Sequence, residues 1–241
     1  MGVRVDFHTH ILPAMDDGSK STEQSVQMLM LEKQAGIDTV VLTPHFYAHS
    51  DRPERFLHRR QQSFEALKAA VEGTDTVQLK LGAEVYWFNG ISDWEGLADL
   101  AIEGTDFVLI EMPFERWSEK ILCELEDIYR KRGLVPIVAH IERYINAFSA
   151  PRVLGQLRDM NVMIQANGEF FTHSRTRSLA LKMLKNGDID LIGSDCHNLA
   201  DRAPDLDRAQ EVIRARLGEE IFEQINRAED RVLPCNAKQI I

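Results

Sequence analysis

Cysteine is scarce in this chain of 241 residues, and the three cysteines lie far apart. Cys123, Cys196 and Cys235 are odd in number and form no CxxC pair, which argues against a disulfide framework and favours a reducing compartment. No apolar run approaches the roughly 20 residues of a membrane-spanning helix, and no apolar signal stretch precedes the first predicted strand. We therefore expect a cytoplasmic protein without direct membrane insertion.

Basic residues are in the minority: 28 lysines and arginines stand against 38 aspartates and glutamates, for a formal net charge of -10. This balance disfavours broad contact with nucleic acid or with an anionic membrane surface. A stripe of alternating aromatic and basic side chains is also missing, so we expect no nucleic-acid partner. The acidic excess is compatible with a cation site that is rich in carboxylates.

The chain also lacks low-complexity segments and clean internal repeats, and strand-like apolar runs alternate instead with amphipathic helices. Strands are predicted from residue 3 and at 37–43, 77–84, 106–111, 134–139, 162–166 and 188–193. Helices are predicted after Ser21, from Pro53, and at 118–132, 151–160 and 174–186. About seven strand–helix rounds predict a single α/β domain over residues 1–241, with a parallel sheet that closes into a barrel.

The first of these helices has a recognisable start. Ser21 is a predicted N-cap, and Gln24 occupies the position of a capping-box partner. Val26, Leu29 and Met30 recur at helical spacing and form its predicted apolar side.

Two apolar runs end in a pair of metal-type ligands. Val3, Val5 and Phe7 alternate as a strand does, and the run ends in His8 and His10. Strand side chains two residues apart point the same way, so the two imidazoles converge on one point where a cation can bind. Far downstream, the run that ends at residue 193 leads to a second pair with the same spacing, Asp195 and His197, and Cys196 between them points away.

Four further apolar runs each end in a single residue of the metal-binding type: His45, Glu84, Glu111 and His140. In α/β barrels the carboxyl ends of the strands bring such residues together. Six endings of this kind in order predict a multinuclear metal centre. Asp17 is a further candidate, in a turn where one of the adjacent Asp16 and Asp17 is expected to serve the turn itself.

Three other histidines do not end an apolar run and are expected at the surface: His49, His58 and His173.

These motifs together resemble the PHP (polymerase and histidinol phosphatase) superfamily. The segments that carry the resemblance are 6–10 (DFHTH), 16–18 (DDG), 43–45 (TPH), 82–86 (GAEVY), 139–144 (AHIERY) and 194–198 (SDCHN). Within the superfamily, the chain is most similar to the bacterial capsule-regulating protein-tyrosine phosphatases, over residues 3 to about 205. The resemblance implies a distorted (β/α)7 barrel of the PHP type, three divalent metals, and hydrolysis of phosphotyrosine on proteins. It also implies a phosphorylated bacterial tyrosine kinase of polysaccharide assembly as partner, with the kinase's tyrosine-rich tail as substrate.

The resemblance assigns ligands to each metal: His8, His10 and Asp195 to the first, Asp17, His45 and His197 to the second, and Glu111 and His140 to the third. Glu84 then bridges two of the metals. Arg143 and Arg202 match the phosphate-binding arginines of the family, and the planar guanidinium suits bidentate contact with phosphate. Imidazole and carboxylate ligands without thiolate favour manganese, with iron, zinc or cobalt as alternatives, over magnesium or calcium.

Several assignments have a structural alternative. Arg143 can pair with Glu142 or another acid as a structural salt bridge, and Arg202 can simply be solvated. The aromatic segment 86–88 and Trp117 line either a phosphotyrosine cleft or the core. Two other functions also stay open. One is a small-molecule phosphomonoesterase of the histidinol-phosphate type or a phosphodiesterase, and the other is a non-catalytic regulator that keeps its metals.

Residues Cys196 to Arg202 match C-x5-R, the signature of cysteine-dependent tyrosine phosphatases. That mechanism needs a loop of backbone N–H groups around the phosphate and a thiolate with a lowered pKa. This loop contains no glycine, and Asp195 and Asp201 place negative charge where the phosphate would enter. We therefore predict a metal-activated hydroxide as nucleophile and no role for the thiol.

Overall fold

The computed structural model describes residues 2–148 and 150–234. Its strands are β1 (Val5–Thr9), β2 (Thr39–Leu42), β3 (His45–Phe46), β4 (Gln78–Leu81), β5 (Glu84–Tyr86), β6 (Phe107–Glu111), β7 (Val135–Val138), β8 (Met163–Asn167) and β9 (Leu191–Gly193). Its helices are α1 (Thr22–Gln34), α2 (Pro53–Ala70), the 3₁₀ turns η1 (Ile91–Asp93) and η2 (Glu95–Leu100), α3 (Glu119–Arg132), α4 (Glu142–Phe148), α5 (Ala150–Leu157), α6 (Gly168–Thr172), α7 (Arg177–Asn186), α8 (Leu206–Leu217) and α9 (Glu220–Val232).

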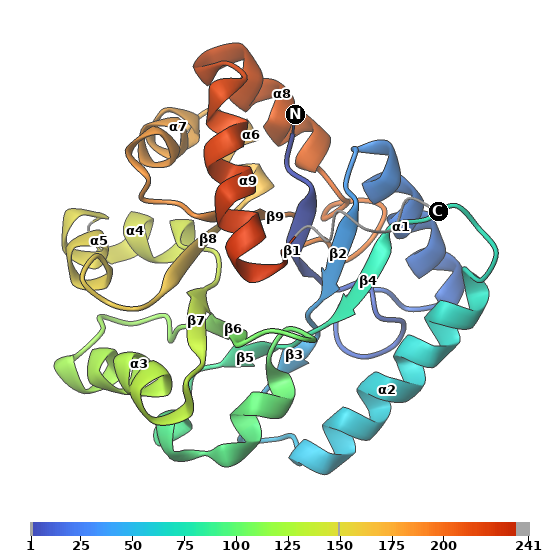
Figure 1. Cartoon of the computed structure of the whole chain (residues 1–241), viewed down its shortest axis with the longest axis horizontal. Coiled ribbons are helices and arrows are strands. Elements are labelled where there is room, and N and C mark those ends of the chain that lie inside the picture. The colour runs from blue at the N-terminus through green and yellow to red at the C-terminus, as the bar shows by residue number, and fades with distance from the viewer. Residues whose placement is uncertain (1, 149, 235–241) are drawn as a thin grey trace.

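The strands pair in parallel throughout the described residues, as predicted. One sheet has the order β1-β2-β4, and the other has the order β3-β5-β6-β7-β8-β9. β9 also lies beside β1, because the N–H of Asp195 donates to the carbonyl of His8 at 2.8 Å and the N–H of His10 donates to that of Cys196 at 2.9 Å. The strands therefore form a curled parallel arrangement at the centre, with helices around its outside (Figure 1).

Apolar side chains cover both faces of the curled strands. The inner cluster includes Phe7 of β1, Val41 of β2 and Leu109 of β6, and Val232 of α9 joins it. The larger cluster packs the opposite faces of the same strands, for example Val40, against the surrounding helices. Strands that are buried on both sides have continuous apolar sequences, and their positions could therefore be predicted from the sequence. Among the described residues, no helix combines the length and the apolar content that crossing a membrane requires.

Two of the predicted strands are interrupted near the carboxyl end. The predicted strand 37–43 corresponds to β2, and β3 follows it after a break at residues 43–44; the predicted strand 77–84 becomes β4 and the start of β5, with a break at residues 82–83. After each break the chain resumes pairing at a candidate ligand, His45 or Glu84. The breaks therefore separate the packed part of each strand from the part that reaches the site.

Helix α1 begins as predicted, and of its predicted apolar side Leu29 is buried and Val26 packs against the core, whereas Met30 was predicted wrongly. The Ser21 hydroxyl accepts the N–H of Gln24 at 3.3 Å, which confirms the N-cap. Met30 is 59% exposed, although it was expected in the core. The buried positions of the helix are Ser25, Met28, Leu29 and Glu32. Two of these are polar and find polar neighbours at the ends of β1 and β9, so hydrophobicity alone could not identify this face.

The helices after β7 and β8 also differ from the prediction. The helix expected at 151–160 is α5, and an additional helix, α4, precedes it; the helix expected at 174–186 is α7, and the short α6 precedes it. Helices α8 and α9 were not predicted at all. Short helices have little intrinsic stability and depend on tertiary packing, so their sequences give a weak signal.

Candidate metal centre

An irregularity in β1 brings His8 and His10 to the centre of the molecule. The register of β1 against β2 shifts between Asp6 and Thr9, so β1 accommodates one extra residue there. Phe7 packs in the inner cluster, and His8 reaches the ligands of the other strands. The Nε2 atoms of His8 and His10 lie 3.2 Å apart. The two imidazoles converge as the i, i+2 spacing predicted.

Glu84 and Asp195 complete this first group. Oε2 of Glu84 lies 3.2 Å from Nε2 of His8 and 3.2 Å from Nε2 of His10. Oδ1 of Asp195 lies 3.5 Å and 3.4 Å from the same two nitrogens. Two imidazoles and two carboxylates from three strand ends thus face one point, and they include the three residues that the resemblance assigns to the first metal.

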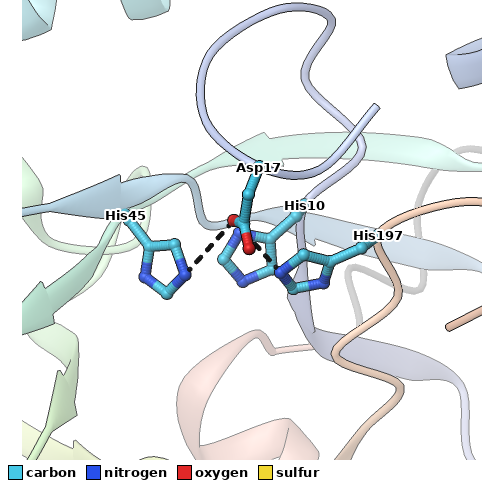
Figure 2. Close-up of side chains that lie close together, drawn as sticks. All are labelled: His10, Asp17, His45 and His197. Atoms are coloured by element: carbon cyan, nitrogen blue, oxygen red, sulfur yellow. Dashed lines mark ion pairs between the residues drawn. The ribbon is translucent and has the colours of Figure 1, made fainter. Parts of the chain in front are cut away.

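A second group forms around Asp17, which lies on the loop after β1 (Figure 2). Its Oδ1 is 3.6 Å from Nε2 of His45 and 3.4 Å from Nε2 of His197. One ligand atom from each of these residues and from His10 all lie within 4.8 Å of one another, a spacing that can hold a metal ion. The three residues that the resemblance assigns to the second metal are therefore together, with His10 between them and the first group.

The third group lies on the other side of Glu84. Nε2 of His140 is 2.8 Å from Oε1 of Glu84 and 3.6 Å from Oε1 of Glu111. Oε2 of Glu84 also lies 2.9 Å from Nδ1 of His45. Both oxygens of Glu84 are thus used, one toward each side, which is the geometry expected of a bridging carboxylate.

The donor atoms of these groups fit a divalent metal. Oε2 of Glu84, Nδ1 of His45 and Nε2 of His197 are buried and make no hydrogen bond within the described residues. They lie near one another, His45 beside Glu84 and His197 beside Asp17, without a hydrogen bond that satisfies them. Buried polar atoms that make no hydrogen bond cost about 1–3 kcal/mol, and a bound cation would satisfy these three. Imidazole and carboxylate donors without thiolate suit manganese, iron, zinc or cobalt.

The closely spaced acids and imidazoles of the centre also favour binding of a cation. Burial and, to a smaller extent, the neighbouring Glu84 carboxylate raise the pKa of Glu111 to about 7. Burial and, to a smaller extent, the nearby His10 lower the pKa of His197 to about 4. Burial alone would raise the pKa of Asp195, but His8 and His10 hold it far below its ordinary value. Acids and imidazoles this close together shift one another's pKa strongly. A bound metal ion stabilises the charged form of the acids and the neutral form of the imidazoles.

Two candidate ligands have an unusual backbone. His140 has a φ of 35° and Asp195 a φ of 55°, both in the left-handed region that residues other than glycine rarely adopt. Each such residue costs on the order of 1–3 kcal/mol, and such residues cluster at functional sites. The strain occurs where β7 and β9 end, at the positions that turn these side chains toward Glu84 and the histidines.

Arg143 and Arg202 converge on the same carboxylate. Nη2 of Arg143 donates to Oδ2 of Asp195 at 3.3 Å, and Nη2 of Arg202 lies 2.8 Å from that oxygen. Nη1 of Arg143 also donates to Oε1 of Glu111 at 3.0 Å. Arg143 therefore pairs with two acids other than Glu142, which the structural salt-bridge alternative also allowed, and Arg202 is paired with Asp195 instead of being simply solvated. Both guanidinium groups lie beside candidate ligands, and both side chains stay 40% exposed, so an incoming anion can reach them.

Asp16 serves the turn, as was expected of one of the pair Asp16 and Asp17, and it also contributes to the site. Its Oδ2 accepts the Nδ1–H of His10 at 2.7 Å and the backbone N–H of His45 at 2.9 Å, and its Oδ1 accepts the N–H of Gly18 at 2.9 Å. A carboxylate on the far nitrogen of a histidine orients the ring and leaves Nε2 free for a metal. Asp17, which is more exposed, is the member of the pair that faces the second group.

Gln165 and Asn167, at the end of β8, also escaped prediction. Asn167 donates to Oδ2 of Asp195 at 2.9 Å, and Oε1 of Gln165 lies 3.3 Å from Nδ1 of His8. Their only sequence signal is that two amides alternate with apolar residues at the end of a predicted strand.

Cys196 has the predicted orientation. It is fully buried, and its sulfur lies 3.8 Å from Oε1 of Glu32, on the side away from Asp195 and His197. Burial raises the pKa of the thiol well above its ordinary value, and the Glu32 charge raises it further. Such a thiol is a poor nucleophile. Cys123 and Cys196 are both free thiols, and Cys235 lies outside the described residues.

The other histidines and the aromatic segment take separate positions. The three histidines expected at the surface are exposed: His49, His58 and His173. The ring of Tyr47 stacks on His45 at a centroid distance of 5.2 Å and lies 5.8 Å from Tyr86, at the edge of the metal centre. Trp87 and Phe88 pack against the core instead, and the indole N–H of the buried Trp117 donates to the carbonyl of Pro113. Tyr86 alone among the candidate cleft aromatics faces the site.

Comparison with known proteins identifies the family. The family model described as "Capsular polysaccharide synthesis, CpsB/CapC" matches residues 4–233. The chain belongs to this family. Tyrosine-protein phosphatase CpsB of Streptococcus pneumoniae is 28% identical over 231 residues, which cover 89% of this chain and 91% of that protein. Tyrosine-protein phosphatase YwqE of Bacillus subtilis is 25% identical over 226 residues, which cover 90% of this chain and 86% of that protein.

A solved structure supports the fold of this CpsB/CapC family member. It comes from the crystal structures of Bacillus subtilis YwqE and Streptococcus pneumoniae CpsB, which are described as metal-dependent tyrosine phosphatases. The superposition has a TM-score of 0.80 at 24% sequence identity and covers 94% of this chain and 93% of the other. The curled parallel α/β architecture is therefore shared along almost the whole length of both chains.

Proposed function

We propose that this protein is a metal-dependent protein-tyrosine phosphatase. The single observation that carries the proposal is that the predicted acids and histidines, from six strand ends and one loop, gather in adjoining groups around Glu84 and Asp17, with Arg143 and Arg202 beside them. The family membership and the names of the relatives point the same way. The proposed substrate is phosphotyrosine on a protein, and the proposed partner is the phosphorylated tail of a bacterial tyrosine kinase in polysaccharide assembly.

We assign the nine ligands to three divalent metals, with manganese as the preferred ion. His8, His10 and Asp195 hold the first, Asp17, His45 and His197 the second, and Glu111 and His140 the third. Glu84 bridges two of them, which is supported by its two oxygens facing opposite groups. His10 lies close enough to the second group to serve either of two metals.

The reaction needs charge neutralisation and a strong nucleophile, because hydrolysis of a phosphate monoester in water is extremely slow. Clustered divalent metals, when bound, screen the phosphoryl oxygens and lower the pKa of a bound water to near neutrality. Arg143 and Arg202 contribute the remaining positive charge, and each exchanges its contact with Asp195 for a phosphoryl oxygen. The departing tyrosinate is a fairly good leaving group, so no side chain is required to protonate it.

The aromatic ring of the substrate has a matching surface at the edge of the centre. Tyr47 and Tyr86 lie 5.8 Å apart between centroids and close to Glu111, whose charge raises the pKa of both phenols after the larger effect of burial. Aromatic side chains in this position favour a phenyl ring over an aliphatic alcohol. This supports a substrate whose phosphate is attached directly to an aromatic ring, as in phosphotyrosine.

We further propose that residues 1–241 form one domain with a distorted (β/α)7 barrel. Counting β2 with β3 and β4 with β5 as interrupted strands leaves seven, and the contact of β9 with β1 closes the ring. A cytoplasmic location, where kinase tails and reduced thiols occur together, fits the two free cysteines.

The test is a hydrolysis screen combined with elemental analysis of the purified protein. A phosphotyrosine peptide, histidinol phosphate and a cyclic dinucleotide are compared at equal concentration, with and without prior chelation. We expect bound divalent metal and a preference for the phosphotyrosine peptide that chelation abolishes. Preference for histidinol phosphate or for the cyclic dinucleotide would replace the proposed substrate. A metal-bound protein that hydrolyses none of them would be a non-catalytic regulator.

A further inference from the structure

Strand β8 ends in two amides instead of metal ligands. Gln165 and Asn167, called here the β8 amide pair, share one side of the strand because they are two residues apart. Gln165 is fully buried. The neighbouring strands β7 and β9 lead to His140 and Asp195, so the amide pair lies between candidate ligands on both sides.

One backbone group sets the orientation of the whole pair. The N–H of His140 donates to the side chain of Gln165 at 2.8 Å, and because it can only donate, the receiving atom must be the oxygen Oε1. Nδ1 of His8 lies 3.3 Å from the same oxygen, so this nitrogen must carry the hydrogen. A neutral imidazole has one such hydrogen, which leaves Nε2 of His8 with a free lone pair. That Nε2 atom faces Glu84 and Asp195.

The same logic continues to Asp195. With Oε1 of Gln165 used as acceptor, its Nε2 donates to Oδ1 of Asn167 at 3.0 Å. The amide nitrogen of Asn167 then donates to Oδ2 of Asp195 at 2.9 Å. Both arginines lie at this same Oδ2, whereas Oδ1 is the oxygen that faces His8 and His10. The pair thus distinguishes the two oxygens of Asp195.

The close packing around Gln165 depends on a glycine in the next strand. A Cβ atom on Gly193 would lie 2.7 Å from Cβ of His8 and 2.9 Å from Nε2 of Gln165. Contacts below 3.0 Å require these groups to move. Gly193 therefore leaves the room in which Gln165 approaches His8, and this observation is independent of the hydrogen-bond directions.

We propose that Gln165 and Asn167 are positioning residues for the metal centre. They select Nε2 of His8 and Oδ1 of Asp195 as the metal-binding atoms and hold both in place. The inference rests on the metal-binding part of the proposed function, and it is independent of which phosphate ester is hydrolysed. It predicts that removing the amides weakens metal binding even when every ligand is still present.

The experiment measures the affinity for Mn²⁺ by competition with a chromophoric chelator, together with the visible spectrum of the Co²⁺-loaded protein. Gln165→Leu removes the amide at similar volume, and Asn167→Leu removes the contact with Asp195 and the acceptor of the Gln165 amide nitrogen while leaving the contacts of Gln165 with His8 and His140 in place. Asn167 makes no side-chain capping bond to α6, so this second variant is expected to fold if the first does not. The matched control is Gln210→Leu, a buried glutamine on α8 that donates to the carbonyl of Ala35.

We expect Mn²⁺ to bind roughly 10- to 100-fold more weakly in both β8 variants, with an altered Co²⁺ spectrum. Gln210→Leu lowers the melting temperature but keeps the wild-type affinity and spectrum. Wild-type affinity and spectrum in the folded β8 variants would overturn the positioning role and leave the phosphatase proposal intact. Failure of the wild-type protein to bind metal would overturn both. Metal binding without phosphotyrosine hydrolysis would contradict only the phosphatase proposal.

Discussion

Replacing Arg143 by lysine separates phosphate recognition from a structural salt bridge. In the structure the two terminal nitrogens of Arg143 contact two different acids, at 3.0 Å to Glu111 and 3.3 Å to Asp195. Lysine keeps the positive charge but lacks the planar fork that contacts two oxygens at once. If the arginine clamps phosphoryl oxygens in the transition state, it contributes on the order of 2–4 kcal/mol, so kcat/KM should fall about 30- to 1000-fold.

A purely structural salt bridge of Arg143 predicts different changes in melting temperature and in kcat/KM. The Arg143 side chain is 40% exposed, so solvent screens its ion pairs, and such pairs contribute about 0–1 kcal/mol to stability. For a chain of this size, 1 kcal/mol shifts the melting temperature by roughly 2–4 °C. A purely structural arginine would therefore change the melting temperature by a few degrees and leave kcat/KM near the wild-type value.

The assay measures kcat/KM on a phosphotyrosine peptide, metal stoichiometry and melting temperature on the same preparations of Arg143→Lys and Arg202→Ala. Arg158→Ala is the control, because Arg158 forms an exposed ion pair with Asp188 at 3.1 Å. We expect both site variants to keep their metal and lose turnover, while the control keeps both. Near wild-type kcat/KM in both site variants would refute phosphate binding by these arginines and remove the second support for the phosphatase proposal.

Three further predictions concern the metal ligands and their surroundings. Cys196→Ser should retain hydrolysis of para-nitrophenyl phosphate, since the thiol is buried beside Glu32, and chelation should abolish that hydrolysis. Loss of activity in this variant at full metal occupancy would contradict the metal-hydroxide mechanism. His140→Ala should abolish turnover and His173→Ala should leave turnover largely intact, because His140 lies in the candidate metal centre and His173 is exposed outside it. A strong loss of turnover in folded His173→Ala would mean that the ligands are misassigned. Asp16→Asn should weaken Mn²⁺ binding roughly 10- to 100-fold, because the amide orients His10 less firmly than the carboxylate does; unchanged affinity in a chelator competition would limit Asp16 to the turn.

Much of the fold was predictable because the strands are buried on both faces. The runs at 106–111, 134–139 and 162–166 match β6, β7 and β8 to within one residue at each end, since continuous apolar segments between turns have few other uses. Gly133 ends α3 with a positive φ as its position in the sequence suggested. The buried side of α1 was not predictable in the same way, because Ser25 and Glu32 are buried by polar partners that lie elsewhere in the chain.

By itself, the sequence determined which residue types stand at the end of each strand, because the alternation of apolar residues and the i, i+2 spacing are local properties. That was sufficient to bring His8 with His10, and Asp195 with His197, onto common sides. Only the tertiary structure decided the rest: that Asp16 serves His10 while Asp17 faces the second group, and that Gln165 binds His8. These relations depend on strand register, on the extra residue in β1 and on the curl that places the end of β9 beside β1. Distances across strands arise from packing over the whole chain, and no local pattern encodes them.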